Sequence, residues 1–162
     1  MKERIAFLII NWKSSAMLLR CLACIAKQES IKPEVFVLDN SNDDPMAEVY
    51  CSRFSSVQFY KSEKNIGFAA GNNLLFQKTE GYEWIVLVNP DAFLEPDWLS
   101  KMLSAAIAHP EYSFFASRLV QSVNHEILDG DGDTMHVSGW AWRQGNFEPV
   151  PHDVIKPMNM MG

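Results

Sequence analysis

Long apolar runs, a cysteine framework and a surplus of basic residues are all missing from this sequence. No stretch of 18 consecutive apolar residues could span a bilayer, and the early apolar run at 5–10 is too short for the core of a signal peptide. Three cysteines, an odd number, argue against a disulfide framework. With 14 basic against 20 acidic residues and a net charge of -6, no nucleic-acid partner is expected. These absences predict a cytoplasmic globular protein.

Cys21 and Cys24 form a C-x-x-C pair, which in other proteins can be a redox or metal site. Redox pairs lie at a helix N-terminus just after a strand, whereas this pair lies inside an apolar stretch. No second pair of ligands accompanies it, because the four histidines are dispersed. We interpret the two cysteines as small core residues spaced i, i+3.

Short apolar runs rich in β-formers alternate with segments of helical period. Strands are predicted at 5–10, 35–38, 57–60, 84–88 and 112–116, and helices at 14–28, 45–54, 68–78 and 96–108. Strands that are apolar at nearly every position, such as FLII and WIVLV, fit a sheet covered on both faces, and β-α-β order makes such a sheet mostly parallel. The predicted fold class is α/β, followed beyond Arg118 by loops and a small hairpin.

Ligands of an open parallel sheet bind outside the carboxyl ends of its strands, which makes the residues just after each strand functional candidates. After the second strand, in VLDNSNDDP, Asp39 can accept hydrogen bonds from a ribose or a base N–H. A polar turn in which Asp43 and Asp44 start the next helix is compatible with that role. The candidate segments are 11–13, 39–42, 61–65 and 89–91.

The segment SEKNIGFAAGNN places Gly67 and Gly71 at the start of a predicted helix. The small residues permit close approach of a ligand to the backbone, and they equally permit tight packing of the helix on the sheet. Both interpretations stay open. The segment matches neither G-x-G-x-x-G nor a Walker loop, so a dinucleotide oxidoreductase or a P-loop enzyme is not supported.

In VNPDAF, Pro90 keeps Asn89 extended and places Asp91 just beyond the sheet edge. A hard divalent cation would accept that carboxylate together with carbonyl, water and diphosphate oxygens. The alternative, Asp91 as the cap of the helix near Pro96, is weakened because Asp91 lies several residues too early.

The acidic run Asp129, Asp131 and Asp133 does not fit a calcium-binding EF-hand loop. Thr134 stands where the frame requires glycine, and Trp140 stands where it requires glutamate. We expect a glycine-rich acidic loop, whose carboxylates could face a sugar.

Taken in order, IINW, VLDNSNDD, NIGFAAGNN and LVNPDAFLEPDWL resemble family 2 glycosyltransferases, especially the rhamnosyltransferase-like branch, as does LDGDGD followed by GWAWRQG. The resemblance covers residues 4–148. It implies a GT-A (Rossmann-like) fold, with a mostly parallel sheet and helices on both faces, truncated at its C-terminus. It also implies a donor-binding α/β region at 1–118 and, at 119–162, the incomplete start of an acceptor region.

The resemblance further assigns roles to residues. Asn89-Pro90-Asp91 matches the D-x-D-type position, with Asp91 as metal ligand and with Asn89, in place of the first acid, serving the diphosphate or the sugar. The donor-binding residues implied are Asn11 and Trp12 in the nucleotide pocket, Asp39 and Asn40 at the base and ribose, and Asn65, Gly67 and Asn73 at the donor border.

The chemistry implied is inverting transfer of a sugar from a dTDP- or UDP-sugar to a glycan or lipid-linked acceptor, with Mn²⁺ or Mg²⁺, in cell-surface polysaccharide synthesis. The general base is expected beyond Gly162, so no catalytic residue is assigned. The location implied is the cytoplasm, with peripheral association at the inner face of the membrane left open, as is the oligomeric state. A non-catalytic nucleotide-sugar-binding fragment is the main alternative. A nucleotidyltransferase is less favoured, because NWKSSAM is not the Gly-rich basic loop that a triphosphate requires.

Overall fold

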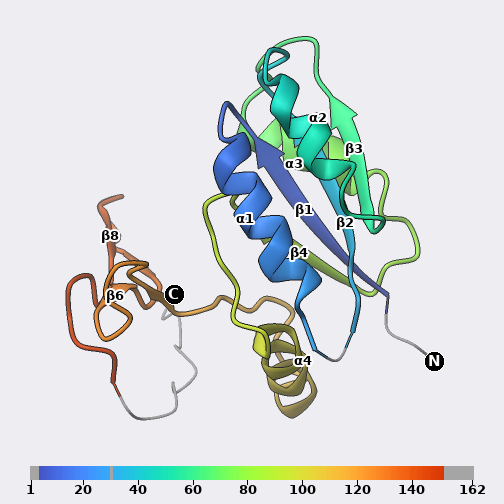
Figure 1. The fold of residues 1–162 in the computed structure, drawn as a ribbon. Helices are drawn as coiled ribbons and strands as arrows, with labels where there is room; N and C mark the ends of the chain where they lie inside the picture. Colours follow the sequence, from blue (N-terminus) through green and yellow to red (C-terminus); the bar gives the residue numbers. More distant parts are fainter. Residues whose placement is uncertain (1–3, 30, 152–162) are drawn as a thin grey trace. The chain divides into compact units, whose positions relative to one another are not determined.

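The computed structural model describes residues 4–29 and 31–151 of the protein (Figure 1). The chain divides into two units, residues 1–108 and 109–162, which are described separately below. The functional regions expected at 1–118 and 119–162 stay a prediction. No helix of the described residues is long and apolar enough to cross a membrane.

The first unit contains one four-stranded parallel sheet with the strand order β3-β2-β1-β4. The predicted α/β class with a parallel sheet is therefore confirmed. The elements are β1 (Ile5–Asn11), α1 (Ser15–Ala26), β2 (Glu34–Asp39), α2 (Pro45–Cys51), β3 (Val57–Lys61), α3 (Phe68–Phe76), β4 (Trp84–Val88) and α4 (Trp98–Ala108).

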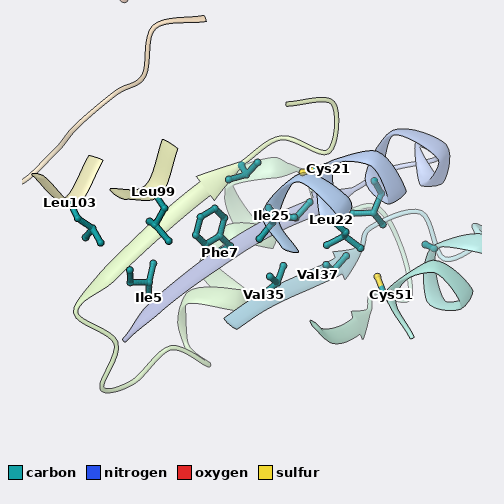
Figure 2. Packing of buried hydrophobic residues seen from close by; sticks show 14 residues of the cluster. Ile5, Phe7, Cys21, Leu22, Ile25, Val35, Val37, Cys51, Leu99 and Leu103 are labelled. Atoms are coloured by element: carbon teal, nitrogen blue, oxygen red, sulfur yellow. The ribbon is translucent and has the colours of Figure 1, made fainter. Parts of the chain in front are cut away.

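Helices cover both faces of this sheet, as predicted. Residues of α1, α2 and α4 form one core cluster with one face of the strands, around Phe7, Ile25 and Leu99 (Figure 2). On the other face, Leu75 of α3 packs in a second cluster with Leu8 of β1. Every residue of β1 is buried. A strand with apolar residues on both faces is stable only in such a three-layer arrangement.

Gly71 lies where α3 crosses the sheet. A Cβ atom at this position would meet Ile10 Cδ1 at 3.0 Å and Leu38 Cδ2 at 3.3 Å. Of the two interpretations left open for these glycines, tight packing on the sheet therefore applies to Gly71. Gly67 differs, because nothing lies within 4 Å of the Cβ position there.

The three cysteines of the chain are free thiols. Cys21 is buried in the core, as predicted, whereas Cys24 is only half-buried. Burial, then Cys24 and the carboxylate of Asp91, raise the pKa of Cys21 to about 12. A thiol held neutral in this way packs as a small apolar residue.

The strand expected at 112–116 is not formed. Phe114 is 94% exposed, and residues 112–116 pair with no strand in the described part of the chain. An apolar run becomes a strand only where a neighbouring strand pairs with it and a core covers it.

The second unit contains short antiparallel pairs. β5 (Leu119–Val120) pairs with β6 (Leu128–Gly130), and β7 (Asp133–Met135) pairs with β8 (Ala141–Arg143). The loops and small hairpin expected beyond Arg118 are confirmed.

Candidate functional site

The carboxyl ends of the four parallel strands meet at one edge of the sheet. Asn11, the last residue of β1, is in register with Asp39, the last residue of β2. On the other side of β1, Ile9 is in register with Val88, the last residue of β4. Neighbouring strands lie about 4.8 Å apart, so β2 and β4 are spaced about 10 Å apart across β1. The predicted residues at positions 11, 39 and 89 thus lie along one edge.

Asp39 is fully buried, yet only one of its carboxylate oxygens is used by the protein. Oδ1 accepts hydrogen bonds from the Ser41 amide at 3.1 Å and from the Ser41 hydroxyl at 2.6 Å. Oδ2 has no hydrogen-bond partner, and neither has Oδ1 of the adjacent, fully buried Asn11. Buried acceptors are normally satisfied, and leaving one unpaired costs about 1–3 kcal/mol. A ligand or an ordered water that donates hydrogen bonds would satisfy these two unused acceptors on adjacent strand ends.

Asn40 joins the loop after β2 to the loop before α3. Its Nδ2 donates to Asn65 Oδ1 at 3.1 Å and to the Gly67 carbonyl at 3.3 Å, and its Oδ1 accepts from the Ile66 amide at 3.0 Å. Asn65 Oδ1 also accepts from the Gly67 amide at 2.8 Å. Asn40 and Asn65 are therefore occupied with holding this loop, and their contact with a nucleotide stays a prediction.

Gly67 caps the N-terminus of α3 with φ 85° and ψ 166°, a conformation open almost only to glycine. The first turn of α3 is exposed, and so is Asn73 in its second turn. The helix therefore presents unobstructed backbone and an amide side chain to solvent. These are the groups that a donor bordering this helix would meet.

Asp44 stands at the N-cap position of α2, directly before Pro45, as predicted, but its side chain does not cap that helix. Asp44 Oδ2 accepts hydrogen bonds from the Ser15 amide and from Asn11 Nδ2, each at 3.2 Å, so it serves α1 and gives α2 no side-chain cap. Asp43 forms an ion pair with Lys13 at 3.0 Å. The side-chain cap on α2 is not formed because the fold brings the start of α1 within reach, and the Asp44 carboxylate bonds to Ser15 and Asn11 instead.

Trp12 follows Asn11 immediately and is 56% exposed. Its indole is thus accessible at the position that follows Asn11 in the chain, and it offers a flat apolar surface on which a planar ring can stack. Its assignment to the nucleotide pocket stays a prediction.

The turn after β4 holds Asn89 and Asp91, both exposed. The Asn89 carbonyl accepts hydrogen bonds from the Ala92 amide at 3.0 Å and from the Cys21 thiol at 3.8 Å, which ties the turn to α1. Helix α4 begins only at Trp98, so Asp91 does not cap it. The Asp91 carboxylate is therefore left for solvent or a ligand.

Gln28 holds the segment that follows this turn, although no motif indicated it. Its side chain is fully buried, Nε2 donates to the Glu95 carbonyl at 2.8 Å, and Oε1 accepts from the Leu99 amide at 2.9 Å. The signal in the sequence is a polar residue that continues the buried stripe of α1 one step beyond Ile25. A buried amide in such a position requires partners.

The acidic run of the second unit is neutralised by arginines rather than by a metal site. Asp131 makes a bidentate pair with Arg118, at 3.0 and 3.3 Å, and Asp129 accepts from Arg143 at 2.9 Å. This pairing agrees with the acidic loop expected in place of an EF-hand. Within residues 4–29 and 31–151, no three His, Cys, Asp or Glu side chains gather so that they could hold a metal ion alone.

A divalent cation would fit this edge of the sheet only if the bound ligand supplied part of its coordination. The donor set at the end of β4 is one exposed carboxylate, Asp91, with the exposed amide of Asn89 nearby in the chain. Mg²⁺ and Mn²⁺ in such sites take one or two carboxylates and complete their coordination with phosphate oxygens and water. The residues present are compatible with that arrangement.

The solved structures that are similar to this chain include glycosyltransferases of the GT-A fold, the fold that the sequence motifs implied. They include residues 1–349 of S. aureus TarS in complex with UDP-GlcNAc, with a TM-score of 0.60, 19% identity and coverage of 66% of this chain and 32% of that one. A mannosyltransferase from Pyrobaculum calidifontis, in complex with GDP-Man and Mn²⁺, has a TM-score of 0.59, 18% identity and coverage of 65% and 33%. The chain thus spans about a third of the length of these proteins.

A comparison with curated proteins finds no match. The family model of glycosyl transferase family 2 matches residues 7–138, which is most of the chain and includes every predicted site residue. The chain therefore belongs to glycosyl transferase family 2.

Proposed function

We propose that this chain is the donor-binding part of a glycosyltransferase that uses a nucleotide-diphospho-sugar. The observation that carries the proposal is the pair of unused buried acceptors, Asn11 Oδ1 and Asp39 Oδ2, on adjacent strand ends. A nucleoside supplies the donors that these acceptors lack, namely base N–H groups and ribose hydroxyls. Membership of glycosyl transferase family 2 supports a nucleotide-sugar as that ligand.

The proposed donor extends along the sheet edge. The nucleoside lies at β1 and β2, where Asn11 and Asp39 accept its hydrogen bonds and Trp12 offers a stacking surface. The diphosphate lies toward β4, which is spaced about 10 Å from β2, a separation that a nucleoside diphosphate can span. The loop held by Asn40 and the exposed start of α3 border the sugar.

Asp91, with Asn89, is proposed to hold Mn²⁺ or Mg²⁺ together with the diphosphate. When bound, the cation would neutralise the charge that develops on the departing nucleoside diphosphate. The mannosyltransferase solved with GDP-Man and Mn²⁺ supports this combination of ligands. The contribution of this chain is a single carboxylate presented beyond the sheet edge.

Transfer with inversion to a glycan or lipid-linked acceptor, in polysaccharide synthesis at the cytoplasmic side of the membrane, is the most specific form of the proposal. It rests on the ordered motifs and on their likeness to the rhamnosyltransferase-like branch. Inverting transfer needs a general base on the acceptor side, which is expected in sequence beyond Gly162. The proposed donor base is uracil or thymine.

A thermal-shift panel tests the proposal with UDP, dTDP and GDP, each with and without Mn²⁺. A nucleotide present at 100 times its Kd stabilises the folded state by about 2.7 kcal/mol, which raises the Tm of a chain of this length by about 5–10 °C. Asp91→Ala should remove the part of the shift that depends on Mn²⁺, whereas the control Glu80→Ala, an exposed acid at the opposite edge of the sheet, should retain it. If no nucleotide shifts the Tm, donor binding is wrong.

A further inference from the structure

The second unit carries an exposed aromatic surface that donor binding does not use. Trp140 is 76% exposed and Trp142 is 52% exposed, and both lie on the β7–β8 hairpin. We propose that the face formed by Thr134, His136, Trp140 and Trp142, called the tryptophan face below, binds a neutral carbohydrate chain as the acceptor. The ligand's role as acceptor rests on the proposed function, whereas its chemical class rests on the hairpin alone.

The register of the hairpin places these four residues on one face. Thr134 is directly opposite Trp142, and the His136 amide donates to the Trp140 carbonyl at 2.7 Å, which extends the same ladder by another pair. Side chains directly opposite each other in an antiparallel pair share a face, and so do residues two apart along a strand. Trp140, just before β8, and Trp142 within it therefore share this face, with their Cα atoms about 7 Å apart along the chain.

The opposite face of the hairpin contacts β6 through Arg143, whereas Met135 on that same face is 76% exposed. Arg143 lies on that opposite face, and a Cβ atom at Gly130 of β6 would meet its Cδ at 2.5 Å. Arg143 Nη1 also donates to Asp129 Oδ2 at 2.9 Å. Both contacts join β8 to β6 through Arg143, and the exposure of Trp140 and Trp142 means that the indoles contribute little to the core of the unit.

Indoles beside polar groups form a surface suited to sugars. The C–H face of a pyranose ring packs on an indole, while its hydroxyls need hydrogen-bonding groups around the ring. His136 supplies one, because its Nδ1 lies 3.2 Å from the Ser138 amide and accepts that proton. With Nδ1 accepting, the ring proton lies on Nε2, which can donate to a hydroxyl.

The charge of this unit favours a neutral carbohydrate over a membrane or a nucleic acid. Residues 109–151 contain six acidic and only two basic residues, and both arginines are paired with aspartates. Hairpins that insert into anionic membranes, like surfaces that follow a phosphate backbone, depend on lysine and arginine. A polyhydroxylated ligand without charge meets no repulsion here.

The proposal is tested on the full 162-residue chain with glucan, mannan, galactan and rhamnan tetrasaccharides, by titration calorimetry. We expect at least one of them to bind, and we expect the double variant Trp140→Ala, Trp142→Ala to weaken that binding at least tenfold. Phe114→Ala removes an aromatic side chain that is 94% exposed in the same unit and serves as the matched control with unchanged binding. Circular dichroism and Tm establish that each variant folds.

Two results would overturn the tryptophan face as a carbohydrate site. One is that no tetrasaccharide binds, or that the double variant binds as well as the wild type. The other is sedimentation of the wild type, but not of the double variant, with phosphatidylserine vesicles, which would assign the tryptophans to a membrane. The nucleotide-induced Tm shift is measured on the same samples, so a failure of donor binding is seen separately from a failure of carbohydrate binding.

Discussion

Replacing Gln28 by leucine tests how the segment between Asp91 and α4 is held in place. The substitution keeps a similar volume but removes the acceptor of the Leu99 amide and the donor to the Glu95 carbonyl. Leu99 is buried, so its amide loses its partner away from water, at a cost of about 1–3 kcal/mol, and the lost bond to Glu95 adds about 1 kcal/mol. We expect Gln28→Leu to lower the free energy of unfolding by about 2–4 kcal/mol, and the Tm by about 5–15 °C.

The assay is urea unfolding followed by tryptophan fluorescence, in which the midpoint should fall at an unchanged slope. Gln77→Leu, an exposed glutamine at the end of α3, is the matched control and should stay within about 0.5 kcal/mol of the wild type. Since Gln28 holds the segment between Asp91 and α4, its variant should also lose part of the Mn²⁺-dependent Tm shift. A Gln28→Leu protein as stable as the control would refute the proposed role of this amide.

Three further predictions follow from the site and the core. Asp39→Asn should weaken nucleotide binding about 10- to 100-fold in calorimetry, because a hydrogen bond to a charged group is worth about 1.5–3 kcal/mol; equal affinity would remove Asp39 from the site. Gly67→Ala should destabilise the protein by about 1–3 kcal/mol in urea, since φ 85° strains any residue with a Cβ; an unchanged midpoint would contradict this. Burial above all raises the pKa of Cys21 and of Cys51 from 9.0 to about 12, and for Cys51 the Asp39 carboxylate adds to the rise. Between pH 9 and about 12 the unfolded chain therefore binds fewer thiol protons than the folded one, so stability falls as the pH rises, by up to about 1.4 kcal/mol per pH unit for each thiol. Replacing both cysteines by alanine should flatten the pH profile of urea unfolding, and parallel profiles would refute the assignment.

Most of the fold could be predicted because its signals are local. β1 and β4 are apolar at nearly every position, and such runs form parallel strands in α/β proteins. The burial expected of both is confirmed for β1, whereas in β4, at the end of the strand order, only Val88 is buried and Leu87 is 58% exposed. The end of β4 was predicted to the residue because Pro90 cannot continue a ladder of hydrogen bonds. Residues 112–116 have the same apolar character, and they failed as a strand because pairing depends on a partner that the local sequence does not reveal.

The candidate site likewise has features that the sequence predicted and features that it did not. Positions just after each strand were predictable, since the carboxyl edge of a parallel sheet follows from β-α-β order alone. The roles within the site were not, because a hydrogen-bond partner can come from anywhere in the chain. Asp44 serves α1, which precedes it by a whole strand, and Asn40 is occupied by the loop before α3.

The sequence by itself determined that the chain is an α/β domain of this family, and that Asp39 and Asp91 stand at strand ends. Apolar periodicity, proline and the order of motifs are properties of short segments, so they can be recognised in the sequence without a structure. Only the tertiary structure decided which buried polar atoms the protein satisfies itself and which it leaves unpaired. The unpaired oxygens of Asn11 and Asp39 are visible only when every other donor has been placed, because satisfaction of a buried group is a property of its whole surroundings.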